Sequence, residues 1–185
     1  MKFIIVMFII LFSASSNAAD VGIETGLELP RYVSLKSNES NIRVGPSKNY
    51  PISIKYVVKN FPIKIVDEYK DWRKVIDFQE NTGWIHKSLI KGERNGIVIS
   101  SNKENIYLYN SINGKKIGEV THGSIVNLSK CKLNWCLINK NKFKGWIPKN
   151  YLWGVKKNEK FNIRFFQIFL DYYFTSINLL NKYLS

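Results

Sequence analysis

Two cysteines and two histidines are the residues of this chain most able to do covalent or acid–base chemistry. Cys131 and Cys136 flank residues 132–135, and the histidines are His86 and His122. A cysteine nucleophile needs a histidine within hydrogen-bonding reach and a third group that orients that histidine. The short spacing of the cysteines instead favours a disulfide across the tip of a hairpin, with metal ligation or catalysis left as alternatives.

Other signatures of catalysis are missing from the sequence. There is no HExxH zinc-binding pattern and no glycine-rich phosphate-binding loop, and the 14 acidic residues are scattered rather than paired. We therefore expect a protein that is not an enzyme and that needs no metal and no cofactor.

Aromatic side chains offer binding chemistry instead. Flat apolar rings with a polar edge bind extended peptides at a small cost in entropy. The candidates for ligand binding are Tyr50, Tyr69, Trp72 and Trp84, with core or rim packing as the alternative for the two tryptophans. A second aromatic set, Tyr107, Tyr109, Trp135 and Trp146, follows later in the chain.

These aromatic residues lie in a duplicated segment. The phrase GWIHKSLIKG begins at Gly83, and GWIPKNYLWG begins at Gly145. Upstream of the two phrases Trp72 matches Trp135, and the run NIRV matches the run NIYL, which begins at Asn105. Similarity at a nearly constant spacing indicates two copies of one small fold, which we place at residues 31–92 and 93–155.

The apolar pattern inside each copy has a period of two. Residues 62–69 and 124–131 show this alternation, and turn-forming Asn, Gly and Pro residues separate such runs. These features predict β-strands, and no stretch before residue 156 is long enough for a core helix. Each copy has too few short strands to cover both faces of an open sheet. We therefore expect an all-β fold of two small, strongly bent barrels.

The order of the motifs resembles the bacterial SH3-like (SH3b) domain, in particular its tandem-repeat envelope form. The residues that carry the resemblance are Asn41, Arg43, Gly45, Pro46, Tyr50, Pro51, Trp72, Gly83 and Trp84. The second copy departs from the pattern, because Tyr107 stands where an arginine is expected and the Gly-Pro and Tyr-Pro pairs are missing. The resemblance implies two tandem SH3-like domains in a bacterial cell-envelope protein.

The N-terminus has the composition of a cleaved signal peptide. Lys2 precedes an apolar run over residues 3–12, and small residues lead to a cleavage site near Ala18 or Ala19. An uncleaved anchor is the alternative, although the run is short for a membrane span. We expect residues 1–19 to be the leader, residues 20–30 a linker, and the mature protein to be periplasmic or otherwise in the envelope.

The net charge of +14 bears on the partners. A positive surface attracts polyanions such as peptidoglycan carboxylates or anionic lipid headgroups. The alternative is a compositional bias towards Lys, Asn and Ile that carries no functional meaning. Nucleic acid is disfavoured as a partner, because arginine is scarce and the leader directs the chain out of the cytoplasm.

The last residues, 156–185, form a segment of different composition. A cationic link precedes residues 161–184, in which polar residues recur every three or four positions and predict an amphipathic α-helix. Its apolar side could dock on a membrane interface, pack on the barrels or on a second subunit, or belong to a partly disordered extension. The sequence does not choose among these.

Together these features predict an exported, non-enzymatic binding module or adaptor of the cell envelope. Its expected partner is a peptidoglycan peptide or an envelope protein, bound by the SH3-like barrels. The alternative is a membrane-tethered or oligomeric accessory subunit, in which the C-terminal helix docks on an anionic membrane surface or on a partner.

Overall fold

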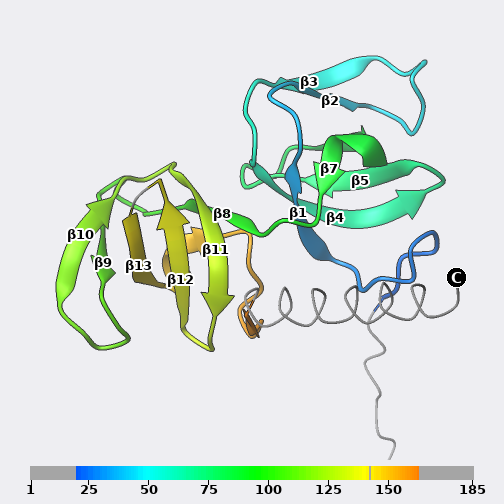
Figure 1. Ribbon diagram of the computed structural model, residues 1–185. Helices are drawn as coiled ribbons and strands as arrows, with labels where there is room; N and C mark the ends of the chain where they lie inside the picture. The colour runs from blue at the N-terminus through cyan, green and yellow to red at the C-terminus, as the bar shows by residue number, and fades with distance from the viewer. Residues whose placement is uncertain (1–19, 142, 163–185) are drawn as a thin grey trace, which may run out of the picture.

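The computed structural model describes residues 20–141 and 143–162 of the chain. Within them the fold is almost entirely β. Two antiparallel sheets follow one another along the chain, and the helical content is limited to two short 3-10 helices (Figure 1). The all-β prediction is confirmed.

The first sheet has the strand order β3-β2-β6-β5-β4-β1-β7. Its strands are β1 (Arg31–Leu35), β2 (Ser40–Arg43), β3 (Ile52–Tyr56), β4 (Pro62–Tyr69), β5 (Trp72–Ile76), β6 (Thr82–His86) and β7 (Ile90–Lys91). The 3-10 helix η1 (Lys87–Leu89) joins β6 to β7.

The second sheet has the order β10-β9-β13-β12-β11-β8-β14, with a further strand, β15, paired to β11. Its strands are β8 (Asn95–Val98), β9 (Ile106–Tyr109), β10 (Lys116–Val120), β11 (Ile125–Cys131), β12 (Trp135–Lys140), β13 (Phe143–Pro148), β14 (Leu152–Trp153) and β15 (Phe161–Asn162). The 3-10 helix η2 (Lys149–Tyr151) precedes β14.

Each sheet surrounds its own hydrophobic core. Leu35, Ile63 and Val75 are fully buried in the first sheet, and Leu128 and Ile138 are fully buried in the second. Successive side chains of a strand point to opposite faces, so alternate residues enter the core of a curved sheet. This arrangement is the physical origin of the period-two pattern in the sequence.

The duplication is visible in the topology, because every strand from β1 to β7 has a counterpart at the same place in the order of the second sheet. One detail of the predicted match is wrong by two residues. Arg43 lies opposite Trp84, and Tyr109 lies opposite Trp146. The two tryptophans belong to the matching phrases, so Arg43 corresponds to Tyr109 and not to Tyr107. A longer loop before the strand in the second copy causes the shift.

The two sheets contact each other through buried polar side chains and half-buried aromatic ones. The Ser34 hydroxyl donates to the Glu93 carbonyl at 2.7 Å and accepts from the Asn95 amide at 2.9 Å. Tyr32 of the first sheet meets Trp153 of the second edge to face, with ring centres 5.1 Å apart. Both contacts are non-local, and they join the two copies directly.

Residues 20–30, expected to be a linker, fold against the first sheet. The segment closes a turn in which the Leu29 amide donates to the Asp20 carbonyl at 2.7 Å. The backbone amides of Glu24 and Thr25 both donate to the Glu68 carboxylate on β4. We call residues 20–30 the N-terminal strap.

The segment after residue 155 begins as part of the second sheet. Phe161–Asn162 is the strand β15, which pairs with Lys130 and Cys131 of β11. The helix predicted over residues 161–184 is therefore wrong for its first two residues, because their backbone groups complete the edge of β11. The rest of that helix, and the predicted signal peptide, lie outside the described residues. Among the described residues no helix is long and apolar enough to cross a membrane.

Candidate functional site

Three of the four predicted aromatic residues surround one pocket of the first sheet. Tyr50, Tyr69 and Trp72 line a cavity of about 450 Å³. The other lining residues are Pro46, Ser47, Lys70 and Asp71. The pocket therefore lies between the loop that joins β2 to β3 and the tip of the β4–β5 hairpin. We call it the hairpin pocket.

The loop that carries Tyr50 is held from two sides. The Arg43 guanidinium donates to the Tyr50 carbonyl at 2.6 Å. The Tyr50 ring lies so close to Gly45 that a Cβ atom on this glycine would be 2.7 Å from three of the ring atoms. Glycine at this position therefore lets the ring pack against the backbone, and the Gly-Pro motif gains a local explanation.

The hairpin tip carries the other two rings. Tyr69 ends β4 and faces Trp72, which begins β5. Lys70 between them has a left-handed backbone with φ of 50°, as tight turns require. The Arg73 guanidinium donates to the carbonyls of Lys70 and Trp72, each at 2.8 Å. These bonds fix the tip from behind.

The rings differ in how far they reach solvent. Tyr50 is 46% exposed and Tyr69 is 48% exposed, whereas Trp72 is 9% exposed. Trp72 packs its indole edge to face against His86, with ring centres 5.4 Å apart. The two tyrosines can contact a ligand directly, and Trp72 forms a rigid wall that they stand against. Trp84 is half-buried on β6 and is not among the residues that line the pocket.

Charged groups of both signs stand at the rim. The Lys70 ammonium lies 5.4 Å from the centre of the Tyr69 ring. Asp71 pairs with Lys87 at 2.8 Å, and this hydrogen bond and the charge of Lys87 hold the pKa of Asp71 below its ordinary value. The Lys70 ammonium is thus available to a charged group of a bound molecule, whereas the ionised Asp71 carboxylate is paired with Lys87.

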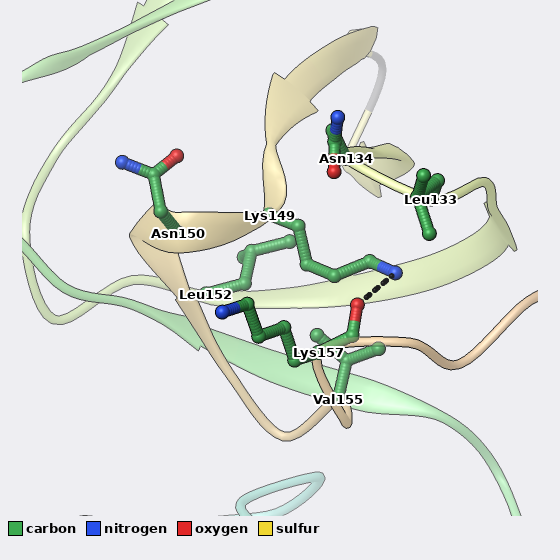
Figure 2. Close-up of a pocket in the computed structure, with 7 residues that line it drawn as sticks. All are labelled: Leu133, Asn134, Lys149, Asn150, Leu152, Val155 and Lys157. Carbon is green, nitrogen blue, oxygen red and sulfur yellow. Dashed lines mark hydrogen bonds between the residues drawn. The ribbon is translucent and has the colours of Figure 1, made fainter.

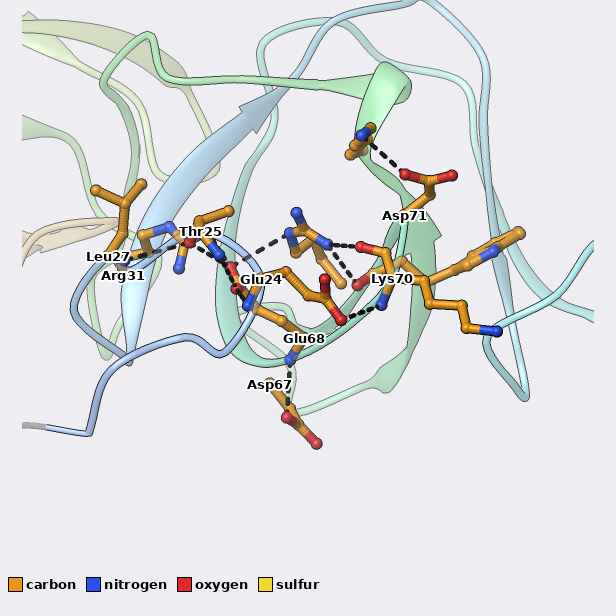
Figure 3. Close-up of polar contacts among 11 residues, drawn as sticks. Glu24, Thr25, Leu27, Arg31, Asp67, Glu68, Lys70 and Asp71 are labelled. Atoms are coloured by element: carbon orange, nitrogen blue, oxygen red, sulfur yellow. Dashed lines mark hydrogen bonds and ion pairs between the residues drawn. The ribbon is translucent and has the colours of Figure 1, made fainter.

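A buried carboxylate behind the pocket was not singled out by sequence reasoning. The Glu68 side chain is fully buried and accepts from Arg31 at 2.5 Å and from the Thr25 hydroxyl at 2.8 Å (Figure 3). Arg73 completes the cluster, with its Nε 3.3 Å from Glu68. The Lys70 amide also donates to Glu24 of the strap. The strap, Glu68 and Arg73 therefore support the hairpin tip together.

The protonation of Glu68 follows from these contacts. Burial alone raises the pKa of a carboxyl group, but the hydrogen bonds from Arg31, Thr25 and the strap amides outweigh it and lower the pKa of Glu68 to about 2. Glu68 is thus ionised at neutral pH. No local pattern in the sequence indicates this cluster, because its members come from two segments, residues 24–31 and 68–73, that are far apart in the chain.

The two cysteines form the expected disulfide. Cys131 of β11 and Cys136 of β12 face each other across the hairpin, with their sulfur atoms 1.99 Å apart. The bond occupies both thiols, so neither is free to bind metal or to attack a substrate. In the described part of the chain, no three His, Cys, Asp or Glu side chains are grouped so that they could hold a metal ion.

A second pocket, of about 460 Å³, lies beside the tip of that hairpin. Figure 2 shows Lys149 extending across it towards the backbone of Lys157. The Lys149 ammonium donates to the Lys157 carbonyl at 3.2 Å and to the Glu159 carbonyl at 2.7 Å, and burial lowers its pKa. This lysine is therefore occupied in holding the segment that leads to β15.

Comparison with known proteins supports the fold. A profile of the bacterial SH3 domain family matches residues 36–92 and 110–154. Comparison with curated proteins finds no match.

Three solved structures are similar at low identity. NlpC2 from Trichomonas vaginalis is 16% identical, with 67% of this chain and 48% of that chain covered and a TM-score of 0.31. An NlpC/P60 family protein from Bacillus cereus is 12% identical, with coverages of 66% and 55% and a TM-score of 0.30. NlpC1 from Trichomonas vaginalis is 19% identical, with coverages of 79% and 50% and a TM-score of 0.30.

This chain spans about half the length of each of these three proteins. The family profile, in contrast, matches most of both sheets and more than half of the whole chain. The duplicated topology agrees with that match. The chain belongs to the bacterial SH3 domain family.

Proposed function

We propose that this protein is an exported, non-enzymatic binding module of the cell envelope that binds a cell-wall peptide in the hairpin pocket. The observation that carries the proposal is the convergence of Tyr50, Tyr69 and Trp72 on one cavity from two separate segments. Rigid aromatic side chains of this kind give large contact areas at a small entropic cost.

The charges around the pocket favour a peptide with free ionic groups. Lys70 is placed to meet a carboxylate, and a ligand amine can reach the Asp71 carboxylate by replacing Lys87, its exposed partner. The excess of positive charge on the whole chain favours approach to the anionic cell wall. An envelope protein that presents an extended acidic segment is the second partner compatible with this chemistry.

The contacts of the histidines support a binding role rather than a catalytic one. His86 Nδ1 accepts from the Ser88 amide at 3.3 Å and lies 2.7 Å from the Ser88 hydroxyl, as a cap of η1. In the described residues no hydrogen bond joins the other ring nitrogen of His86 to a carboxylate. His122 Nδ1 accepts the amide of Ser100. Each imidazole is thus used to hold a nearby turn.

The disulfide supports export. Disulfides persist in oxidising compartments and are rare in the bacterial cytoplasm. The bridge between Cys131 and Cys136 therefore fits a protein that is exported from the cytoplasm and loses its signal peptide on export.

The test is retention of the protein on purified peptidoglycan. Tyr50→Ala and Tyr69→Ala should each weaken retention by about tenfold, because each removes a half-exposed ring from the pocket. Neither should shift the melting temperature by more than a few degrees, since the rings contribute little to the core. A soluble cell-wall stem peptide should compete with the retained protein.

Two variants serve as controls. Phe143→Ala removes a ring that is 72% exposed on the second sheet, and it should leave retention unchanged. Trp84→Ala should lower the melting temperature, because this half-buried ring packs on the sheet. Loss of stability in the two tyrosine variants equal to that in Trp84→Ala would refute the assignment of the pocket, as would failure of the stem peptide to compete.

A further inference from the structure

We propose that the second sheet carries an independent site for a neutral saccharide. The site is a pocket of about 280 Å³ between β9, the loop of residues 99–105 and η2. Tyr107, Tyr109 and Tyr151 line it together with hydroxyl and amide side chains of the loop. It shares no lining residue with the hairpin pocket and does not depend on the function proposed for that pocket.

The tyrosine rings are held in place from behind. Tyr109 meets Trp135 edge to face, with ring centres 5.4 Å apart. The Lys116 ammonium lies 3.4 Å from the centre of the Tyr107 ring and covers one face of it, yet Tyr107 remains 43% exposed. Tyr151 packs against the core of the second sheet. The aromatic wall is therefore formed before any ligand arrives.

The loop on the other side of the pocket is fixed by its own hydrogen bonds. The Ser100 amide donates to His122 at 3.0 Å, and the Lys103 amide donates to the Ser100 carbonyl at 3.1 Å. At its far end, the side-chain amide of Asn105 donates to the Glu119 carboxylate at 3.1 Å. These bonds give the loop a defined shape, in which Ser101 and Asn102 remain at the pocket.

This aromatic wall is absent from the first sheet, although the fold is the same. The strand registers show which residues of the two sheets correspond. The backbone bond from the Lys36 amide to the Leu89 carbonyl in the first sheet matches the bond from Ile99 to Tyr151 in the second. By that correspondence Tyr107, Tyr109, Pro148 and Tyr151 stand where the first sheet has Asn41, Arg43, His86 and Leu89. The fold therefore does not require these rings. Their presence in one copy alone points to a ligand rather than to structural need.

The lining chemistry selects a saccharide. Aromatic rings pack against the C–H faces of sugars, and hydroxyl and amide groups exchange hydrogen bonds with sugar hydroxyls. Of the described residues that line the pocket, only Glu104 is charged, which favours a neutral ligand over a polyanion or a charged peptide end. The volume of about 280 Å³ lies just below the roughly 300–1,000 Å³ that is usual for ligand sites, and it suits one or two rings of a longer chain.

The test is to titrate the full chain separately with chitotetraose, maltotetraose and tetra-alanine and to measure binding by calorimetry and by NMR. We expect saturable binding of at least one of the two saccharides, with the largest shifts in β9 and in the loop of residues 99–105. Which saccharide binds tells an acetylated amino-sugar chain from a plain glucan, and either result supports the proposal.

Variants locate the binding. Tyr107→Ala should weaken the saccharide affinity about tenfold, because it removes the most exposed ring of the wall. Asn102→Ala, in an exposed loop position, should weaken the saccharide affinity severalfold. It tests the site independently if the tyrosine variant fails to fold. Phe143→Ala, on the same sheet but outside the pocket, should bind as the unaltered chain does. Absence of saturable binding to both saccharides, binding of tetra-alanine alone, or unchanged affinity in both variants would overturn the proposal.

Discussion

Glu68 is the residue on which the hairpin pocket most depends. Its buried carboxylate lies between the cations Arg31 and Arg73 and also accepts hydrogen bonds from the N-terminal strap. Removing the charge leaves two largely buried guanidinium groups without their counterion. Breaking a buried ion pair from one side costs about 3–5 kcal/mol.

Glu68→Gln should therefore lower the free energy of unfolding by about 3 kcal/mol at neutral pH. Thr25→Ala is the matched control, because it removes only one hydrogen bond to the same carboxylate and should cost about 1 kcal/mol. Denaturant unfolding of the three proteins at pH 7 measures both differences. Equal stability of Glu68→Gln and the unaltered protein would show that the cluster contributes nothing.

The pH dependence has a definite sign. The pKa of Glu68 falls from an ordinary value of 4.5 to about 2 on folding, so the unfolded chain binds the proton more readily. The contribution of Glu68 to stability is complete above pH 4.5 and is lost as the pH falls from 4.5 towards about 2. Asp77 and Glu159 also have lowered pKa values and act in the same direction. The slope of stability against pH in this range should be smaller in Glu68→Gln.

At the scale of elements, two corresponding hairpins are stabilised by different means. The β4–β5 hairpin is supported by Glu68, Arg73 and the strap, whereas the β11–β12 hairpin is closed by the disulfide between Cys131 and Cys136. The first hairpin leaves its tip open towards a pocket lined by aromatic residues. The second hairpin is bridged by the disulfide close to its tip, and this bridge restricts the movement of the tip.

The mature protein should contain no reactive thiol, because both cysteines are used in the bridge. Reduction should lower the free energy of unfolding of the second sheet by about 2 kcal/mol, the loop-entropy value for so short a ring. Mass spectrometry after alkylation of the native protein counts the free thiols. Unfolding with and without reductant measures the loss of stability. The double variant Cys131→Ser, Cys136→Ser should not respond to reductant. Two alkylated cysteines in freshly isolated native protein would contradict the expectation.

At the scale of the whole molecule, the boundary of the C-terminal segment lies further along than the sequence indicates. Glu159 pairs with Arg94, and Lys156 pairs with Glu28 of the strap. A chain cut after Val155 should therefore lose stability in the second sheet, whereas a chain that ends at Asn162 keeps these pairs and β15. Thermal unfolding of the two truncated chains compares them, and equal stability would refute the role of residues 156–162.

The truncation at Asn162 also tests the membrane-tether alternative. If residues 163–185 dock on a membrane, the full chain should float with anionic vesicles at low salt, because apolar burial and nearby lysines act together. The chain that ends at Asn162 should remain in the soluble fraction. Failure of the full chain to float with either anionic or neutral vesicles would eliminate the tether and leave the envelope binding module.

Several features of this protein were determined by the sequence alone. The alternating pattern and the repeated GWI phrases predicted two small β units, and the spacing of Cys131 and Cys136 predicted the bridge. Tyr69 and Trp72, only three positions apart in the sequence, likewise lie opposite each other at the ends of β4 and β5. Residues on the two sides of a tight hairpin turn must face each other, so short-range spacing is sufficient to place them.

Other features were decided only by the tertiary structure. Glu68 meets the strap across more than forty residues of chain, and Trp84 does not line the pocket. The longer loop before β9 shifts the match between the copies by two residues. Such outcomes depend on strand register and on loop length, which determine which residues of distant segments come into contact. No local pattern in the sequence encodes these contacts. The buried Glu68 cluster and the tyrosine pocket of the second sheet therefore form only in the folded protein.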